Sequence, residues 1–549
     1  MSRSGQVRRR SELGCWAFLV ALLALAAGVW AFATPLFTGP DEVSQARRAV
    51  AVVRGEFTGR QERPGPPLLL TVDVPPMYGE PAEQNFLCHV GPLLDGAPQD
   101  AMALPSPPCP DLASEATAGG PATVEAETVQ YRGQPFFYAL VGLPTLLDEH
   151  VAGARAMRMV GVVATAALLA SAFRTVATSQ RRRLATVGLL ACVTPGVLYL
   201  AGSTNPSAVE IASALSAWTA VAVLATADEA TLDGPLTGRL VRRLGSALVV
   251  LALCRGLGPA FAVAVLAIGT VAAGPGRARV LAARRDVRVW GTALAAAIAV
   301  SGAWLAHIAR EFPLPDRAGS GFATALGWLP WYLHQSVGVF GTNDSGVSPV
   351  AAGVWCAVVV LVIAVGVVLL TRDRTDHPLP SGATTTAGPD RTRVRMAVLS
   401  VVALAGGLMM NVTAEGLSLP PIGFFWQGRY ALPLLLGGIV LATVSAPPAG
   451  ASDLSDPKAD RTPRISWSGE QQLATVGAVF AAAILIVVHL HGLWVVTAHH
   501  GSPAGSGRWV AAVLYAIALA GLVAISLVPA PPSPPEDGDR RPGGSAARA

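Results

Sequence analysis

The sequence predicts an all-α polytopic membrane protein with about 12 membrane segments. Only 14% of its 549 residues are charged, whereas about a quarter are charged in typical soluble domains. The mean hydropathy is +0.49, and 52% of the residues are hydrophobic. Apolar stretches of about 18 or more residues recur along the whole chain, and each is long enough to span a bilayer as a helix. These observations exclude a soluble globular protein.

Ten apolar stretches predict long spans. The first begins near Cys15 and follows an arginine-rich start. No charged residue lies between Leu13 and Pro40, which is too long for the apolar part of a signal peptide. No clear cleavage site of small residues follows, so we expect a retained signal-anchor. The predicted spans are 14–35, 155–175, 184–202, 207–227, 289–309, 350–371, 394–412, 430–446, 471–495 and 508–528.

Residues 244–273, LGSALVVLALCRGLGPAFAVAVLAIGTVAA, predict a short helical hairpin. Arg255-Gly256 and Gly258-Pro259 interrupt this apolar run in its middle. A single straight helix tolerates internal proline and glycine poorly. Two short helices that meet near Arg255 fit better, and they bring the total to about 12 membrane segments.

The arginines predict the orientation, because cytoplasmic loops of membrane proteins are enriched in Lys and Arg. With the hairpin included, one arrangement of the spans places every arginine cluster on the cytoplasmic side, so both termini are expected in the cytoplasm. The expected membrane is a bacterial plasma membrane. A single lysine, Lys458, accompanies 39 arginines, an actinobacteria-like composition typical of a high-GC genome. The expected organisation is a cytoplasmic N-terminus (1–13), a membrane domain (14–446), a cytoplasmic linker (447–470), a C-terminal pair of membrane helices (471–528) and a disordered cytoplasmic tail (529–549).

Residues 36–150 predict a large extracytoplasmic loop. The loop carries six arginines and fifteen acidic residues. A connection of this length has structure of its own or a function. Cys88 and Cys109 are its only cysteines, and disulfides persist in an oxidising compartment. We therefore expect a disulfide between Cys88 and Cys109, and free thiols at the four cysteines in the apolar spans.

Four local patterns resemble a known bacterial membrane family. They are PDEVSQARRAVAVVRGEF (40–57), QPFFYAL (134–140), STNPSAVEIASAL (203–215) and QGRYALPLL (427–435). Their order and spacing resemble the family named domain of unknown function 2142 (DUF2142), from the first span to about residue 446. That family is similar in layout to the GT-C glycosyltransferases, which use polyprenyl-phosphate sugars. The resemblance implies a GT-C-like fold with an acidic catalytic motif in the first outer loop.

Asp41 and Glu42 occupy the place of that acidic motif. A carboxylate can accept the proton that an acceptor hydroxyl loses, so both are candidate catalytic residues, with Asp41 as the base and Glu42 as its partner. The pair is also the candidate ligand set for a divalent metal (Mg, Mn or Ca), which prefers oxygen ligands. The alternative is that the two acids only cap the helix that follows, since acids favour helix N-termini.

Five further residues are candidates for substrate binding. Arg429 lies beside aromatics at the end of a span and can pair with a lipid phosphate; the alternative is an interfacial anchor. Arg255 lies at the tip of the hairpin, where a charge within the membrane suggests a function; the alternative is that the tip is hydrated. Asn205 precedes Pro206 and can start a helix or contact substrate. Tyr138 belongs to the QPFFYAL motif, and Gln45 stands where the resembled family often has histidine.

The leading functional prediction is a membrane glycosyltransferase of GT-C type. It would transfer a sugar from a polyprenyl-phosphate donor to a cell-envelope glycan or lipid on the extracytoplasmic face. The alternatives are a transporter or flippase of a lipid-linked glycan, and a non-catalytic envelope-assembly protein. The modest net charge of +5 gives no indication of nucleic-acid binding, because the arginines lie in short loops between spans. No nucleic-acid partner is expected. Apart from the metal, no cofactor is expected, since no phosphate-binding or dinucleotide motif is present.

Overall fold

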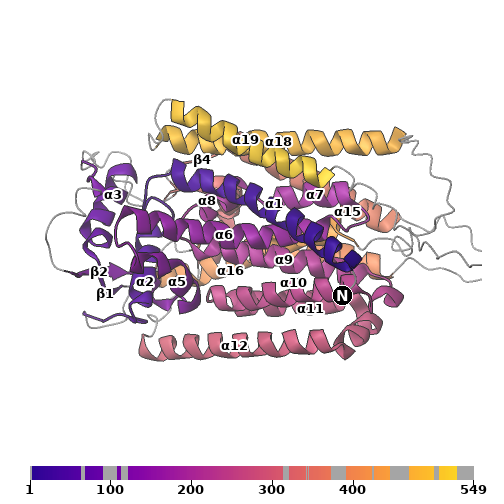
Figure 1. Cartoon of the computed structure of the whole chain (residues 1–549), viewed down its shortest axis with the longest axis horizontal. Coiled ribbons are helices and arrows are strands. Elements are labelled where there is room, and N and C mark those ends of the chain that lie inside the picture. The colour runs from indigo at the N-terminus through magenta and orange to yellow at the C-terminus, as the bar shows by residue number, and fades with distance from the viewer. Residues whose placement is uncertain are drawn as a thin grey trace, which may run out of the picture.

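The computed structural model is a bundle of long helices with a smaller unit at one end (Figure 1). The helices run side by side along the long axis, and the N-terminus lies at the end of the bundle away from the smaller unit. The described residues are 3–62, 69–90, 108–112, 122–312, 321–341, 343, 345–372, 391–422, 426–445, 469–499 and 506–527. The expected tail (529–549) and nearly all of the expected linker (447–470) lie outside these residues.

Nine helices in the described chain are long and apolar enough to cross a membrane. The protein is therefore a multi-pass membrane protein. The nine helices are α1 (Arg3–Ala33), α6 (Val151–Val176), α9 (Pro206–Thr226), α11 (Gly258–Ala283), α12 (Arg285–Glu311), α15 (Pro349–Arg372), α16 (Arg391–Ile422), α18 (Gly469–His499) and α19 (Ser506–Leu527).

A tenth span is counted if a bent pair is taken as one. Helices α7 (Arg182–Cys192) and α8 (Pro195–Ala201) meet at 62°, in the region predicted as one span at 184–202. Pro195 starts the second helix, and the side chain of Thr194 caps it by accepting a hydrogen bond from the Val197 amide at 3.2 Å. A proline has no amide proton to continue the preceding helix, so the bend falls here.

The hairpin prediction was correct in its break and wrong in its length. Helix α10 (Pro235–Cys254) ends one residue before Arg255, and α11 begins at Gly258. The two helices have 20 and 26 residues, so they are not short. Both extend past the apolar run: α10 starts with an arginine-containing half, and α11 continues beyond a kink at Gly274, whose φ is 75°. Apolar length underestimates a helix whose end carries charge.

Helix α17 (Leu432–Thr443) occupies the stretch predicted as a span at 430–446. It has 12 residues and follows the 3₁₀ turn η5 (Gly428–Ala431). Neither α17 nor α10 is counted among the spans by length and composition, yet both pack within the bundle, α17 against α16 and α9, and α10 against α9 and α12. The total of about 12 membrane segments stays a prediction.

Helix α9 lies at the centre of the bundle. The apolar stretch of this helix is buried along its whole length, and the helix packs against α6, α10, α11 and α17. Small residues let membrane helices approach closely, and α9 is rich in alanine and serine. Trp218 is the large exception: its indole donates to the carbonyl of Pro433 at 2.8 Å. A Cβ at Gly437 would lie 2.4 Å from the Trp218 ring, so glycine is required there.

The C-terminal helix pair is attached to the first helix. Helix α19 packs against α1 and α18. The indole of Trp30 donates to the hydroxyl of Tyr515 at 2.9 Å, and that hydroxyl lies 2.8 Å from Nδ1 of His489. This buried polar chain joins α1, α19 and α18. Figure 1 shows the pair on the edge of the bundle opposite α12.

The smaller unit, called here the loop unit, consists of the described residues between 36 and 150. It contains α2 (Glu42–Val53), β1 (Leu70–Val74), η1 (Pro76–Tyr78), α3 (Glu80–Val90), β2 (Val124–Thr128), η2 (Gln130–Arg132), α5 (Pro135–Gly142) and η3 (Leu143–Leu146). The two strands are antiparallel, with Leu70 opposite Thr128 and Val74 opposite Val124. Buried side chains of α2, the strands and α5 form one apolar cluster that continues onto α6 and the ends of α9 and α10.

The remaining described elements lie outside the loop unit. They are η4 (Glu229–Thr231), α13 (Phe322–Gly327), α14 (Leu329–Gly338), β3 (Val339–Phe340) and β4 (Ser345–Gly346).

Candidate active site

The candidate site lies where the loop unit meets the bundle. Five segments end or begin there: the start of α2, helix α5, the start of α9, the junction of α10 with α11, and the turn η5 before α17. Of the residues selected from the sequence, the structure links Asp41 with Arg429 and Gln45 with Tyr138, and places Arg255 against Tyr430 beside Arg429.

Asp41 precedes α2 in a left-handed backbone conformation, with φ of 58° and ψ of 11°. This conformation is uncommon outside glycine, and such strain is concentrated at functional sites. The Asp41 side chain makes no capping hydrogen bond to α2, so the capping alternative does not describe this residue. Instead its Oδ2 accepts a hydrogen bond from the guanidinium of Arg429 at 2.8 Å, and 31% of the side chain is exposed.

Arg429 belongs to a small cationic cluster around Tyr430. Its guanidinium carbon lies 5.0 Å from the centre of the Tyr430 ring, and that of Arg255 lies 4.0 Å from the same centre. The Nε of Arg429 is buried, and no hydrogen-bond partner for it is found among the described residues. Arg255 pairs with the fully buried Glu210 at 3.2 Å. Two guanidinium groups therefore flank one ring beside the carboxylate of Asp41, and such groups match the geometry of phosphate.

Glu42 is committed to partners within the protein. Its Oε1 accepts from Nε of Arg158 at 2.7 Å and from the Thr204 amide at 2.9 Å. Its Oε2 accepts from the second guanidinium nitrogen of Arg158 at 2.6 Å and from the Gly39 amide at 2.9 Å. The Glu42 and Arg158 side chains are only 2% and 1% exposed. Four hydrogen bonds occupy both carboxylate oxygens, an arrangement that fixes the turn before α2.

Asn205 also holds this turn. Its side-chain amide donates to the carbonyl of Pro40 at 2.9 Å, and its side-chain oxygen accepts from the Ser207 amide at 3.0 Å. The second bond is the helix cap expected for this residue at the start of α9. The first ties α9 to the residue just before Asp41, so Asn205 positions the acidic turn.

Gln45 and Tyr138 contact each other across α2 and α5. The Tyr138 hydroxyl donates to the side-chain oxygen of Gln45 at 2.5 Å. Tyr138 is buried, and this burial raises the pKa of its hydroxyl well above the usual value. The hydroxyl therefore stays protonated and can act as a donor at neutral pH.

A small cavity of about 20 Å³ adjoins Arg429, with room for about one water molecule. Pro40, Gln335 and Gln427 are among its lining residues. The Gln335 side chain accepts from the Gly428 amide at 2.8 Å, so α14 supports the turn η5 that carries Arg429. The cavity joins the turn before Asp41 to the turn that carries its partner.

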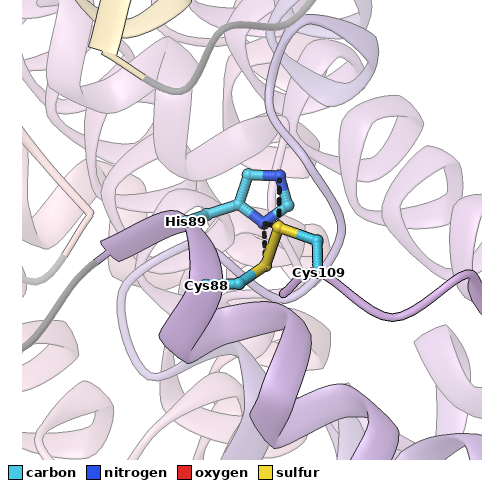
Figure 2. A group of neighbouring side chains, drawn as sticks. All are labelled: Cys88, His89 and Cys109. Carbon is cyan, nitrogen blue, oxygen red and sulfur yellow. Dashed lines mark hydrogen bonds between the residues drawn. A yellow bond between two sulfur atoms is a disulfide. The ribbon is translucent and has the colours of Figure 1, made fainter. Parts of the chain in front are cut away.

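The sequence predicts a divalent-metal site at Asp41 and Glu42. The contacts of Glu42 in the structure disfavour it as a metal ligand. Divalent metals take oxygen ligands, yet both oxygens of Glu42 accept two hydrogen bonds each. Among the described residues, a group of three potential ligands within 4.8 Å of one another occurs at Cys88, His89 and Cys109. Figure 2 shows this group, in which Cys88 and His89 belong to the end of α3.

Cys88 and Cys109 form a disulfide, the pairing expected from the sequence. The ring of His89 lies against the disulfide, with its Nδ1 3.1 Å from the Cys88 sulfur (Figure 2). A metal is bound by thiolates, and both sulfurs are in the disulfide, so the group is not arranged as a metal site. The other four cysteines are free, as expected.

Sequence reasoning missed Arg158 and Tyr430. Arg158 lies inside a predicted span, and a charge at such a position signals a buried partner or a function; that signal was available. Tyr430 follows Arg429 directly, but nothing in the sequence indicates that Arg255 lies over its ring.

The comparison with protein families identifies the chain. Residues 23–437 match the family described as "Predicted membrane protein (DUF2142)". The chain belongs to this family. The DUF2142 match includes Asp41, Arg255 and Arg429. No curated protein matches the chain.

Two similar solved structures are both of ArnT from Cupriavidus metallidurans. The structure in the apo state is 13% identical, with a TM-score of 0.42, and the alignment covers 94% of this chain and 77% of ArnT. The structure bound to undecaprenyl phosphate is 12% identical, with a TM-score of 0.41, and the alignment covers 96% and 77%.

Proposed function

We propose that this protein is a membrane glycosyltransferase that moves a sugar from a polyprenyl-phosphate donor to a cell-envelope glycan or lipid. The observation that carries the proposal is the contact between Asp41 and Arg429 at 2.8 Å, beside Arg255 and Tyr430. Transfer from a phosphate-linked sugar needs a base for the acceptor hydroxyl and cations for the departing phosphate. In the proposal Asp41 is the base, and its ion-pair partner Arg429 supplies a cation for the phosphate.

The proposed reaction uses Asp41 as the general base. The acceptor hydroxyl oxygen forms a bond to the anomeric carbon of the sugar, and its proton moves to the Asp41 carboxylate. The bond between the anomeric carbon and the phosphate oxygen breaks, and its electron pair leaves with the polyprenyl phosphate. Arg429 and Arg255 neutralise the charge that develops on this leaving group.

Donor binding would also prepare the base. A donor phosphate that pairs with Arg429 competes with Asp41 for the same guanidinium. The carboxylate then loses its hydrogen bond at Oδ2 and becomes free to accept the acceptor's proton. The ion pair of the unliganded protein thus keeps the base occupied until the donor arrives.

Glu42 and Asn205 serve this chemistry as positioning residues in the proposal. Glu42 is held by Arg158 and two backbone amides, and Asn205 holds the carbonyl of Pro40. Together they support the strained turn that presents Asp41. The divalent metal stays a prediction, with Asp41 as the residue that would hold it; loss of transfer on chelation, restored by added Mg²⁺ or Mn²⁺, is the result that supports it.

The proposal is tested by Asp41→Asn in membranes supplied with a polyprenyl-phosphate-linked radiolabelled sugar. Asparagine keeps the shape of the side chain but cannot act as the base, and general base catalysis contributes about 10²–10⁴-fold in rate. We expect transfer to fall by that factor at unchanged protein level. Asp233→Asn is the matched control, because the Asp233 side chain is 91% exposed and, among the described residues, its one ion pair is with Arg284 at 3.8 Å.

Equal transfer by Asp41→Asn and the wild type would remove Asp41 from the chemistry. In that case the transporter and assembly alternatives become the better interpretations. Arg429→Lys should raise the donor KM more than it lowers kcat, since lysine keeps the charge but loses the paired donors.

The proposed location is the bacterial plasma membrane, with both termini in the cytoplasm and the loop unit outside. The opposite placement of the N-terminus and the loop unit along the bundle (Figure 1) supports this orientation. Sugar transfer would then take place at the extracytoplasmic face.

A further inference from the structure

A pocket of about 520 Å³ lies between the kink of α11 and the start of α16. Its volume is within the range of about 300–1,000 Å³ that is usual for ligand pockets. The lining residues are Pro275, Arg391, Val394 and Arg395. The residues that form the candidate active site are not among them, so this pocket is a separate feature of the bundle.

The pocket lies near the membrane surface opposite the candidate active site. Helix α11 begins at Gly258, beside that site, and reaches its kink at Gly274 16 residues later. A helix of this length rises about 24 Å, which is most of the roughly 30 Å thickness of a hydrocarbon core. In the proposed orientation, this surface is the cytoplasmic one.

The kink in α11 makes room for a guanidinium group. Gly274 has φ of 75° and ψ of 170°, and Pro275 follows it. Glycine adopts a positive φ readily, and proline has no amide proton to continue the preceding turn. A Cβ at Gly274 would lie 2.3 Å from a terminal nitrogen of Arg395. The backbone at the kink therefore brings Arg395 of α16 close to α11.

The two arginines that line the pocket have no counter-charge among the described residues. Arg395 donates to the carbonyls of Arg391 and Val271 at 3.1 and 3.4 Å and to the hydroxyl of Thr392 at 3.3 Å. All three acceptors are neutral, and two of these distances exceed the usual range of 2.7–3.2 Å. The guanidinium of Arg391 makes no hydrogen bond within the described chain. Both groups can therefore donate to a ligand.

The neighbouring charges leave the pocket cationic. Arg277 ties the two helices together by donating to the carbonyl of Ala227 at 2.6 Å and to the hydroxyl of Thr392 at 2.9 Å. One carboxylate, that of Glu229, adjoins α11 just beyond the kink, since a Cβ at Gly276 would lie 2.5 Å from its Oε1. Glu229 does not line the pocket. The pocket itself thus presents two arginines and no acid.

An apolar stripe leads from the pocket along α16. Val394 lines the pocket, and Val398 and Val401 follow it at positions i+4 and i+7, which share one helix face. Their exposed fractions are 40%, 55% and 57%. Because α16 is one of the helices able to span a membrane, exposed valines on it face the lipid. The pocket and the stripe together match a ligand with an anionic head and an apolar tail.

We propose that this pocket binds an anionic phospholipid. The phosphate accepts hydrogen bonds from Arg391 and Arg395, and one acyl chain lies along Val394, Val398 and Val401. Basic pockets between membrane helices on the cytoplasmic side are typical sites for anionic lipid head groups. A free phosphate ion shares the head-group chemistry but makes no use of the valine stripe, so the experiment separates the two. The bound lipid joins α11 to α16 at the kink.

The test is lipid binding to the purified full-length protein in dodecyl maltoside, measured by native mass spectrometry and by the unfolding temperature. The probes are phosphatidylglycerol, phosphatidylcholine with the same acyl chains, and inorganic phosphate. We expect phosphatidylglycerol to remain bound and to raise the unfolding temperature, because a ligand that binds the folded state stabilises it. Phosphatidylcholine and inorganic phosphate should have little effect.

Arg391→Gln tests the head-group contact. It should weaken the affinity for phosphatidylglycerol about 10- to 100-fold, the range for losing a hydrogen bond to a charged group. The unliganded variant should unfold at the same temperature as the wild type, because the Arg391 side chain has no partner to lose. Arg285→Gln is the matched control: Arg285 is exposed at the start of α12 and does not line the pocket. It should weaken binding at most about 5-fold, the contribution of one surface charge.

Val398→Asn tests the acyl-chain contact. It should weaken the binding of phosphatidylglycerol, whereas Val360→Asn, at a valine of α15 that is also exposed, should not. Equal binding of phosphatidylglycerol and phosphatidylcholine would overturn the proposal, as would equal stabilisation by inorganic phosphate. Unchanged affinity in Arg391→Gln, or a loss no larger than in Arg285→Gln, would also overturn it. Failure of the glycosyltransferase proposal is a separate result, because these measurements involve no sugar transfer.

Discussion

Replacing Glu42 by glutamine should destabilise the protein by about 3–5 kcal/mol, the typical cost of removing one partner of a buried ion pair. The structure explains why no rearrangement relieves this cost. Each oxygen of Glu42 accepts two hydrogen bonds, one from Arg158 and one from a backbone amide. A glutamine amide nitrogen at either position would face two donors. Arg158 would also keep its charge, at 1% exposure, without a counter-charge.

The double variant Glu42→Gln/Arg158→Met separates the ion pair from the rest of this network. It removes the buried charge as well as its partner, so its total loss should be smaller than the sum of the two single losses. A coupling free energy of about 1–3 kcal/mol is expected for residues in direct contact within one network. The loss of about 3–5 kcal/mol expected for Glu42→Gln is a large part of the 5–15 kcal/mol that usually stabilises a folded protein.

The assay is unfolding in mixed micelles with rising SDS, followed by tryptophan fluorescence. Glu125→Gln is the matched control, because Glu125 is 66% exposed and also pairs with an arginine, Arg60, at 3.0 Å. Exposed pairs contribute about 0–1 kcal/mol. If Glu42→Gln cost no more than Glu125→Gln, the argument that Glu42 holds the acidic turn would be refuted, and Glu42 would again be a candidate for the chemistry.

Three further predictions concern the loop unit and the orientation. Cys88→Ser should lower the stability of the loop unit by about 3 kcal/mol in the chain-entropy model, and mass spectrometry of non-reduced protein should find Cys88 linked to Cys109; two free thiols would contradict this. Gly142→Ala should cost about 1–3 kcal/mol, because its Cβ would lie 2.4 Å from the carbonyl oxygen of Ala49, whereas Gly353→Ala, with open space around it, should not destabilise. Glu62→Cys should react with a membrane-impermeant maleimide in intact cells; reaction only after permeabilisation would reverse the proposed orientation.

The sequence by itself determined the class of the protein. Apolar length and scarcity of charge are local properties, and a bilayer imposes them on every spanning helix. The break at Arg255 could also be predicted from the sequence, because glycine and proline change the backbone conformation at their own positions. The lengths of α10 and α11 were not, since the bundle extends both helices past their apolar runs.

The candidate site was only partly readable from the sequence. Asp41, Glu42 and Gln45 lie within five residues of one another, so the sequence alone places them together at the start of one helix. The partner of Asp41 lies 388 residues away, and no local pattern connects the two.

Tertiary structure also separated the two neighbouring acids. From the sequence, Asp41 is the candidate base, Glu42 is its candidate partner, and the two together are candidates for a metal site or a helix cap. A left-handed backbone at Asp41 turns its side chain to Arg429, while Glu42 is buried against Arg158, 116 residues later. Burial and partner charge decide what a carboxylate can do, and both come from residues that are distant in the chain and meet only when the helices pack.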